Sequence, residues 1–548
     1  IGIGNSGSIN IDTKNLSLSR NGFINSDIFG QGNAGNININ ADLITIGEQG
    51  NTTITPSTIS SEAKSGLLEN PLLEANGGNI ILNTGSLLIS NGGDVGVGIN
   101  AIGNSGNITI NATDTVSIDG TGTLNDTEVA SGIFASNLPD SLGNGGSIEI
   151  NAPNFSLTNN AILTTSNSGQ GNAGSINVEV TDDFTAASNS LITSNIGTPQ
   201  GVAAVGQVGN IDIKAREVIF SDNAQIQAGL FSEATGDPGS ISITATESIS
   251  FTGENTGIFS NNDPDSIGKA SDTQLSAPTI SLSDNAFITA SNEGQGGGGN
   301  IIFNANNLNL NSSSIFASTV SNEGGIINFN LADNLTLRNE STISAQAFNN
   351  ANGGNITIDT DFIVAFPNQN NDIIASAQEE GTGGRITIDA ESVFGIQERP
   401  QSDRTNDIDA SGGVDGEVII NTPNVDLTQG LVVAPQNFVE PEQTTTQACQ
   451  SDHLAGNASD LNVIGKGGIS PAPDLPLDSE IITINGKATV ATSSQPRKVI
   501  STSQGEIVPS QGVAITKGGG VILTAYRTDI NQRTPKNSAN CGFKQKTN

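Results

Sequence analysis

Acidic residues recur at matching places in this sequence, and paired carboxylates are the groups with which most glycoside hydrolases work. The acidic candidates that follow strand-like segments are Asp182, Asp183, Asp212, Asp359 and Asp389. Asp359 and Asp389 each follow an Ile-Thr-Ile segment, and Arg385 and Arg399 lie near them. A lyase needs a basic residue beside acidic or calcium-binding groups, and no such set of Lys or Arg is found elsewhere in the sequence. We therefore interpret the acidic residues as outward-facing, solubilising charges at strand ends, and we predict no catalytic residue.

Other reactive side chains are scarce. His453 is the single histidine, so no serine has a histidine base, and one histidine with two distant cysteines does not make a metal set. Trp is absent and Tyr526 is the single tyrosine, which removes the usual platforms on which sugar rings stack. The 19 phenylalanines are expected mostly at inward strand positions. We predict no metal site, no cofactor and no enzymatic activity.

The chain is strongly acidic: 20 Lys and Arg stand against 55 Asp and Glu in 548 residues, a net charge of −35. Such a surface repels nucleic acid and anionic membranes, both of which attract basic patches. No apolar run approaches the roughly 18 residues of a membrane span. We therefore predict neither nucleic-acid binding nor membrane insertion. Met is absent and the first residues already read as part of a repeat, so we expect a fragment whose start is missing.

An internal repeat must position all of these residues. A phrase of the type Gly-x-x-Gly-x-Ile-x-Ile recurs along most of the chain, with a basic period of about 28 and insertions in some copies. A decayed copy lies at Gly268. The last glycine of each intact phrase is expected at a corner of the repeat: Gly7, Gly35, Gly78, Gly106, Gly146, Gly174, Gly209, Gly239, Gly299, Gly325, Gly354, Gly384 and Gly416.

Each period contains three short β-type segments and no long 3.6-residue apolar rhythm, which excludes helix as a major component. In the copy at Gly171 the segments are Ile176–Val180, the region around Phe184, and Leu191–Ser194. We therefore predict an all-β fold, a right-handed parallel β-helix of about 14 coils with three strands per coil. A propeller is the all-β alternative, but its blades need about 40 or more residues.

Two kinds of stacked side chains follow from this fold. Inside, apolar pairs at equivalent places should form a ladder: Phe155/Leu157, Val218/Phe220, Ile249/Phe251, Ile280/Leu282 and Leu335/Leu337. Outside, asparagines after the first segments are expected to form stacked amide ladders with a structural role: Asn40, Asn111, Asn151 and Asn304. The insertions Gln49–Asn76 and Asp119–Ser141 are expected to project as loops.

The repeat stops after about Gly430, which predicts three regions. Residues 1–434 form the rod, residues 435–448 a linker or cap, and residues 449–548 a small separate module. A hairpin is expected within Gly512–Ala525, where apolar runs flank a glycine-rich turn. We predict a disulfide between Cys449 and Cys541, because it would stabilise a module with so small a core. Two buried thiols of a cytosolic protein are the alternative.

The Gly-x-x-Gly-x-Ile-x-Ile coils resemble the β-helical shafts of filamentous-haemagglutinin-like exoproteins, which are exported by two-partner secretion. The tail, CQSDHLAGNASDLNVIGKGGISPAPDLPL followed by QGVAITKGGGVILTAY and a last Cys, is similar to that of cyanobacterial S-layer-like or haemagglutination-domain members. Lys466 stands where Arg is commoner in that tail, and Val513-Ala514 where a Trp is usual. The resemblance implies an outer-membrane transporter as partner, through an N-terminal secretion domain that this sequence lacks. It also implies a location outside the cell or on its outer surface.

We therefore expect a non-enzymatic, secreted or surface-displayed adhesin, with cell-surface or matrix glycans as partners. Such a protein would act by multivalent weak contacts along a repeating face. Two alternatives stay open. One is a polysaccharide-processing β-helix enzyme, either a lyase or a glycosidase, and the other is a purely structural surface filament.

Overall fold

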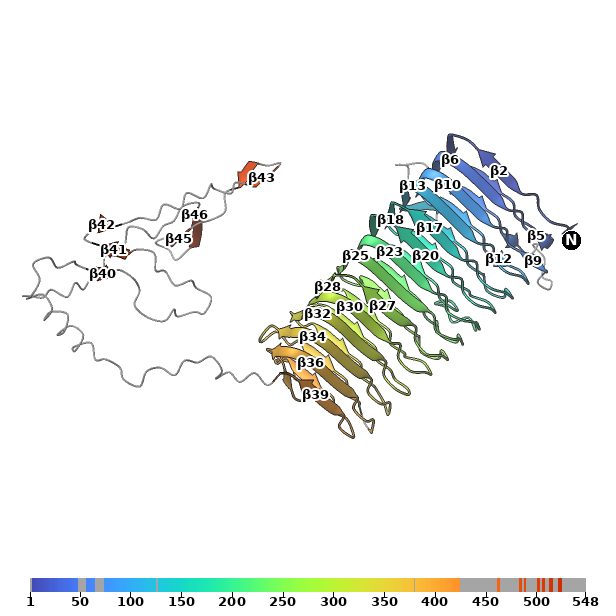
Figure 1. Ribbon diagram of the computed structural model, residues 1–548. Coiled ribbons are helices and arrows are strands. Elements are labelled where there is room, and N and C mark those ends of the chain that lie inside the picture. The colour runs from blue at the N-terminus through green and yellow to red at the C-terminus, as the bar shows by residue number, and fades with distance from the viewer. Residues whose placement is uncertain are drawn as a thin grey trace, which may run out of the picture. The chain divides into compact units, whose positions relative to one another are not determined.

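The computed structural model describes residues 2–47, 56–64, 73–124, 127–378 and 380–423, together with short strands further along the chain. The chain divides into two compact units, Ile1–Asp426 and Leu427–Asn548. All described elements are β-strands, and no helix occurs among the described residues. The first unit is a solenoid of about 13 turns whose strands stack in parallel (Figure 1). The predicted all-β, parallel β-helical fold is confirmed.

The first two segments of each turn build one extended parallel sheet. In most turns they form one long strand that bends at the junction, where the register often shifts as in a β-bulge. In the other turns they are two separate strands. In chain order the strands are β2 (Ile9–Asp12), β3 (Asn15–Leu18), β6 (Ile37–Ile46), β10 (Ile80–Ser90), β13 (Ile108–Asp119), β17 (Ile148–Ala152), β18 (Asn154–Thr158), β20 (Ile176–Val180), β21 (Asp183–Ala187), β23 (Ile211–Ser221), β25 (Ser240–Thr252), β27 (Asp272–Ser276), β28 (Thr279–Ser283), β30 (Ile301–Asn311), β32 (Ile326–Arg338), β34 (Asn355–Ala365), β36 (Arg385–Phe394) and β39 (Glu417–Asn421).

The third segments build a second parallel sheet of 14 short strands. Its strands are β4 (Phe23–Asn25), β7 (Thr58–Ser60), β11 (Asp94–Gly96), β16 (Gly132–Phe134), β19 (Ile162–Thr164), β22 (Leu191–Thr193), β24 (Gln225–Gln227), β26 (Gly257–Phe259), β29 (Phe287–Thr289), β31 (Ser314–Phe316), β33 (Thr342–Ser344), β35 (Asp372–Ile374), β38 (Asp407–Asp409) and β37 (Gln397–Glu398). The last two come from one turn, and β39 opens the next turn shortly before the described part of the unit ends. The count is therefore about 13 turns instead of the predicted 14.

Apart from the hairpin strands β14 and β15, the remaining strands of this unit lie where each turn closes, in two small parallel sheets ordered β1-β5-β9 and β12-β8. They are β1 (Gly2–Ile3), β5 (Gly30–Asn33), β8 (Ala63–Lys64), β9 (Ala75–Asn76) and β12 (Ile99–Asn100). In later turns single parallel bridges continue this corner, for example Leu142 with Gln170.

The core fills the inside of the solenoid with stacked aliphatic and phenyl side chains. Along β20, Ile176, Val178 and Val180 are buried while Asn177 and Glu179 are exposed, as alternation in a strand predicts. In the second segments the predicted apolar pairs lie in register between turns and are buried. Phenyl rings that meet in these columns stack, with centroids 5.2 Å apart for Phe155 and Phe184.

The glycine at each corner lies directly against the carbonyl group of the corner before it. A methyl group added to Gly174 would overlap the Gly146 carbonyl oxygen, and the same holds for Gly106 against Gly78. The column runs through all the corner glycines from Gly7 to Gly416, with Ser271 in the decayed copy. Gly7 belongs to the first turn, and a methyl group there would meet nothing within 4 Å. At the glycines after the first turn a side chain is therefore obstructed by the neighbouring turn and not by the local backbone, whereas the decayed copy holds the Ser271 side chain there.

The two insertions are smaller than expected. In the Asp119–Ser141 segment, β14 (Thr121–Leu124) and β15 (Thr127–Ala130) pair antiparallel as a hairpin, after which β16 resumes the regular turn. In the Gln49–Asn76 segment, β7, β8 and β9 are rungs of the solenoid. The expectation that both whole segments project as loops is wrong, because strand-forming residues inside each of them stack on the neighbouring turns.

The described strands of the second unit are short and antiparallel. They are β40 (Leu461–Val463), β41 (Ile482–Ile484), β42 (Lys487–Ala488), β43 (Ile500–Thr502), β44 (Gly505–Ile507), β45 (Gly512–Ile515) and β46 (Val521–Thr524). β45 and β46 pair with each other, as the hairpin prediction requires. Cys449, Cys541, His453 and the 435–448 linker lie outside the described residues. The disulfide and the three-region division stay predictions.

Gly174→Ala tests the corner constraint. We expect it to destabilise the first unit by about 1–3 kcal/mol, as overpacking of a tight site does, because the new methyl group must displace the Gly146 carbonyl. The matched control is Gly7→Ala, the same position in the first turn. The measurement is the urea midpoint or the melting temperature of both variants. Equal effects of the two substitutions would contradict the account.

Candidate functional site

The structure brings Asp359 and Asp389 together, as their equivalent places in the repeat suggested. They are neighbours in register on β34 and β36, and both are exposed. The nearby arginines are engaged elsewhere: Arg385 forms an ion pair of 2.8 Å with Glu417, and Arg399 binds Asp407. Asp359 and Asp389 thus lie side by side on an open outer face with no cation paired to either of them among the described ion pairs.

Of the other predicted acidic residues, Asp183 and Asp212 belong to surface ion pairs, whereas Asp182 is exposed between β20 and β21 and accepts a bond from the Arg216 amide through its backbone carbonyl. Arg216 lies between Asp183 and Glu247, and binds both carboxylates. Asp212 lies 3.6 Å from Lys214 on the same strand. Exposed pairs of this kind contribute little to stability, about 0–1 kcal/mol each. Their geometry fits the interpretation of solubilising charges at strand ends.

The predicted amide ladder is present on the outer face, and we call it the Asn ladder. Each asparagine donates its Nδ2 proton to the side-chain oxygen of the residue one turn earlier. The bonds are Asn40 to Asp12 at 2.6 Å, Asn83 to Asn40 and Asn111 to Asn83 at 2.9 Å, and Asn151 to Asn111 at 3.1 Å. Asn330 binds Asn304 in the same way at 2.9 Å. An amide has two N–H donors and two acceptor lone pairs, so ladder residues keep hydrogen-bonding capacity for other partners, although Asn151 Nδ2 also donates to Glu149 Oε1 at 3.3 Å.

A cluster that sequence reasoning missed lies in the first three turns, at the second sheet and the corner that follows it. We call Asp27, Glu62, Lys64 and Asp94 the acid–lysine cluster. Lys64 Nζ lies 2.6 Å from Glu62 Oε2 and 3.0 Å from Asp27 Oδ2. The Asp27 carboxylate is 3% exposed and also accepts bonds from Ser60 Oγ and the Glu62 amide, each at 2.9 Å.

Glu62 and Asp94 converge over one point of the backbone. A methyl group on Gly96 would lie 3.1 Å from Glu62 Oε1 and 3.7 Å from Asp94 Oδ2. The exposed ring of Phe29 lies at the edge, with Lys64 Nζ 5.6 Å from its centroid. The arrangement therefore holds two carboxylates close together, with a lysine paired to one of them. The sequence contained only a weak signal of it, Gly92-Gly93-Asp94, which echoes calcium-binding repeats.

Two groups of this cluster, Asp94 and Lys64, have a raised pKa. The shift favours the neutral form of Asp94 and the charged form of Lys64. Burial raises the pKa of Asp94 to about 7, and the charges of Glu62 and Asp27 add to this, while a hydrogen bond from Thr58 and the Lys64 charge oppose it. Burial lowers the pKa of Lys64, but hydrogen bonds and charges from Glu62 and Asp27 outweigh this and raise it. Near neutral pH the site therefore combines a carboxyl group that can give or take a proton with a lysine that stays charged.

A second group of buried carboxylates closes the last turn. Asp372 and Asp407 are 1% and 0% exposed. Asp372 accepts bonds from the Asp407 amide at 3.0 Å and from Gln401 Nε2 at 3.1 Å, and burial raises its pKa. Asp407 binds Arg399 and the Ser402 amide. These contacts fold residues 397–406 over the end of the sheet, so that β37 pairs with β38. The group is a structural end cap, which covers strand edges.

The phenylalanines are not mostly inward, which corrects the expectation from the sequence. Six are fully buried, namely Phe155, Phe184, Phe220, Phe251, Phe303 and Phe329. Others lie on outer positions of the second sheet, whose short strands place the middle residue in the core; β29 buries Ile288 and turns Phe287 outward. Aromatic platforms that the absence of Trp had argued against are therefore available on this face.

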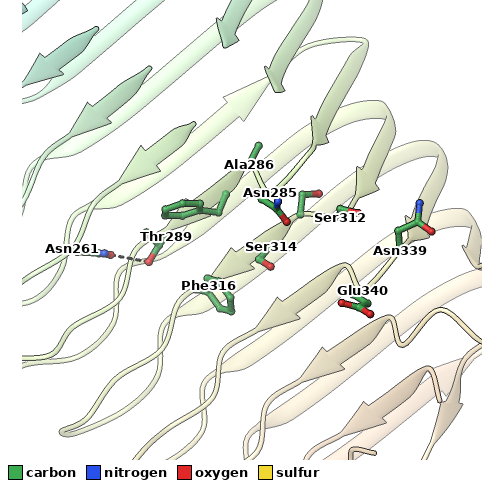
Figure 2. A pocket seen from close by; sticks show the side chains of 11 residues that line it. Asn261, Asn285, Ala286, Thr289, Ser312, Ser314, Phe316, Asn339 and Glu340 are labelled. Carbon is green, nitrogen blue, oxygen red and sulfur yellow. Dashed lines mark hydrogen bonds between the residues drawn. The ribbon is translucent and has the colours of Figure 1, made fainter. Parts of the chain in front are cut away.

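Three outward phenylalanines lie on adjacent turns at a hollow of about 370 Å³. Figure 2 draws the side chains that line this hollow. Phe287 and Phe316 line it, and Phe259 packs edge-on against Phe287 with centroids 4.4 Å apart. Polar side chains surround the rings, and we call the whole the Phe hollow. They are Asn261, Asn285, Thr289, Ser312, Ser314, Asn339 and Glu340.

Comparison of the chain with known protein families, curated proteins and solved structures finds no match. In the part of the chain that the structure describes, no three His, Cys, Asp or Glu side chains are placed to hold a metal ion. A helix long and apolar enough to cross a membrane is likewise not found among those residues.

Asp94→Asn tests the unusual carboxyl group. The folded-state pKa of about 7 lies above the ordinary value of 3.8, so the folded state holds the proton more tightly than the unfolded state. The stability that this contributes is complete below about pH 4, falls as the pH rises towards 7 and stays lost above it, on the order of a few kcal/mol. We expect Asp94→Asn to raise the melting temperature at pH 8 relative to the parent and to change it little at pH 4.

The matched control for this experiment is Asp42→Asn, an exposed aspartate on β6 that is not part of the cluster. It should leave the pH dependence of the melting temperature unchanged. A parental profile and an Asp94→Asn profile that run parallel from pH 4 to pH 8 would show that Asp94 has no special proton affinity.

Proposed function

We propose that this chain is the shaft of an exported surface protein that attaches its cell to other cells, to matrix or to solid surfaces. The proposal is non-enzymatic: attachment comes from many weak contacts along the solenoid. The observation that carries it is the Asn ladder, which repeats a hydrogen-bonding side chain at the same place in successive turns. Export by two-partner secretion, with an outer-membrane transporter as partner, belongs to the same proposal and is supported by the sequence resemblance alone.

The physical support is that a repeated surface suits a repeated ligand. The ladder repeats an amide side chain with remaining hydrogen-bonding capacity at intervals of about 4.8 Å. A single hydrogen bond of this kind contributes only about 0.5–1.5 kcal/mol net, so one turn alone would not hold a partner. Many turns held rigidly in line bind together, because the ordering of the surface is complete before the partner arrives.

Beads coated with the full chain test the attachment function. We expect them to retain cells or polysaccharide particles above beads coated with an inert acidic protein. The triple variant Asn83→Ala, Asn111→Ala, Asn151→Ala should retain severalfold fewer, since it removes three consecutive contacts. Retention at the inert-protein level by the unmodified chain would refute the attachment function.

A second candidate function, a polysaccharide-processing enzyme, is favoured by one observation. Glu62 and Asp94 converge over Gly96, and Asp94 has a pKa near 7, as a general acid requires. In this role Asp94 would protonate the leaving oxygen and Glu62 would act as the base or nucleophile. The open outer face of the sheet would have to bind the sugar chain without a deep cleft.

Reducing-end release from a panel of plant, algal and bacterial polysaccharides tests the second candidate. If it is right, the full chain releases product, and Glu62→Gln lowers the rate by at least a hundredfold. Asp389→Asn, an exposed carboxylate on a distant turn, is the control and should keep the parental rate. Absence of product from every polysaccharide would leave the attachment function alone.

A further inference from the structure

We propose that the Phe hollow binds one neutral pyranose ring of a glycan, stacked on Phe287 and Phe316 and hydrogen-bonded by the side chains around them. The inference rests on the proposed attachment function, for which it names the ligand class and the place of contact. It is independent of the acid–lysine cluster, which lies on the first three turns.

Aromatic and hydroxyl groups alternate at the hollow. β29 and β31 pair so that Phe287 lies opposite Ser314, and Thr289 opposite Phe316. The two phenyl rings therefore occupy one diagonal of a four-residue patch and the two hydroxyls the other. A pyranose combines an apolar C–H face with hydroxyls at its edge, so it can contact the rings and the Ser314 hydroxyl of this patch at once. The Thr289 hydroxyl is buried and bonded to Asn261, so it orients that amide instead of meeting the sugar.

One donor at the edge of the hollow already has a fixed orientation. Asn261 Oδ1 accepts bonds from Thr289 Oγ1 at 2.7 Å and from the Ser291 amide at 3.1 Å (Figure 2). These two bonds settle which end of the amide is oxygen, and they turn the Nδ2 group away from Thr289 and Ser291. Its two N–H groups are available to a sugar hydroxyl without reorganisation.

Further polar groups at the hollow are unused within the described structure. No hydrogen bond or ion pair there involves the side chains of Asn285, Ser314 or Glu340. Asn285 and Glu340 sit in the tight turns before the third strands, with φ of 65° and 64°. Figure 2 shows Asn339 and Glu340 together at one end of the hollow and Phe316 near the other. Sugar hydroxyls both donate and accept, and so can pair with this mixture of amide, hydroxyl and carboxylate.

Size and charge narrow the ligand class. A hollow of about 370 Å³ lies at the small end of the range for ligand sites, which suits one ring better than a buried oligosaccharide. Glu340 and the net charge of −35 disfavour uronic and sialic acids. Phe259 supports the Phe287 ring from its edge, so part of the stacking platform is rigid before binding. The favoured ligand is a neutral hexose or N-acetylhexosamine unit.

The test is ligand-observed NMR titration of the full chain with cellotetraose, chitotetraose and tetragalacturonate. We expect at least one neutral tetrasaccharide to bind in the millimolar range and tetragalacturonate to bind more weakly. Phe316→Ala and Phe287→Ala should each weaken the neutral ligand about tenfold, the upper end of what one aromatic contact contributes. Phe134→Ala is the matched control: a half-buried, outward phenylalanine of the same sheet, outside the hollow, whose removal should leave affinity unchanged.

Each outcome decides one proposal. No binding of either neutral sugar, equal affinity in both hollow variants and the parent, or tighter binding of tetragalacturonate would overturn the sugar site. Phe316→Leu, which keeps an apolar side chain and removes the ring, separates loss of stacking from loss of folding; its melting temperature should match the parent while affinity falls. If sugars bind at the hollow but coated beads retain nothing, the attachment function fails and the site stands. If beads coated with the parent and beads coated with Phe316→Ala retain cells equally well, and no sugar binds, the site fails and the attachment function stands.

Discussion

Successive turns of this solenoid hydrogen-bond to one another in register, about one strand spacing of 4.8 Å apart, and this spacing constrains every position of the repeat. At the corner glycine of most turns it leaves no room for a side chain, so Gly174 faces the Gly146 carbonyl directly. On the outer face it is the distance at which one amide reaches the next, which gives the Asn ladder its 2.9 Å bonds. Inside, it lets phenyl rings stack at 5.0–5.2 Å. Glycine, asparagine and phenylalanine thus recur for one shared geometrical reason.

Those features could be predicted from the sequence because each depends on the period alone. Once the glycine phrase sets the register, Phe155 and Leu157 must lie in line with Val218 and Phe220, and Asn111 with Asn151. Asp359 and Asp389 became neighbours by the same rule. The count of turns was too high by about one, since Gly416 leads into a single described strand.

The acid–lysine cluster and the Phe hollow could not be predicted, for two different physical reasons. Asp27, Glu62 and Asp94 lie on turns of unequal length, so their offsets from the glycine phrase do not match. They are also not all equivalent in register, since Asp94 pairs with Thr58, and only the side chains of the folded chain bring the carboxylates together. The Phe hollow depends on the three-residue strands of the second sheet. In a strand such as Phe287-Ile288-Thr289 only the middle residue turns inward, and an apolar residue at either end looks like core in the sequence. A longer strand would have shown the alternation.

A solenoid separates the energy that holds the fold from the energy that is available for recognition. The inner columns of side chains and the backbone hydrogen bonds between turns stabilise the rod. Residues at outer positions of each turn are therefore free to vary, except at the corner glycines. Phe287 and Thr289 share one rung with Ile288, which alone is buried in the core column. A recognition site can therefore arise on any pair of turns by changes at outer positions only, and its neighbours along the same rigid face add contacts without further loss of conformational freedom.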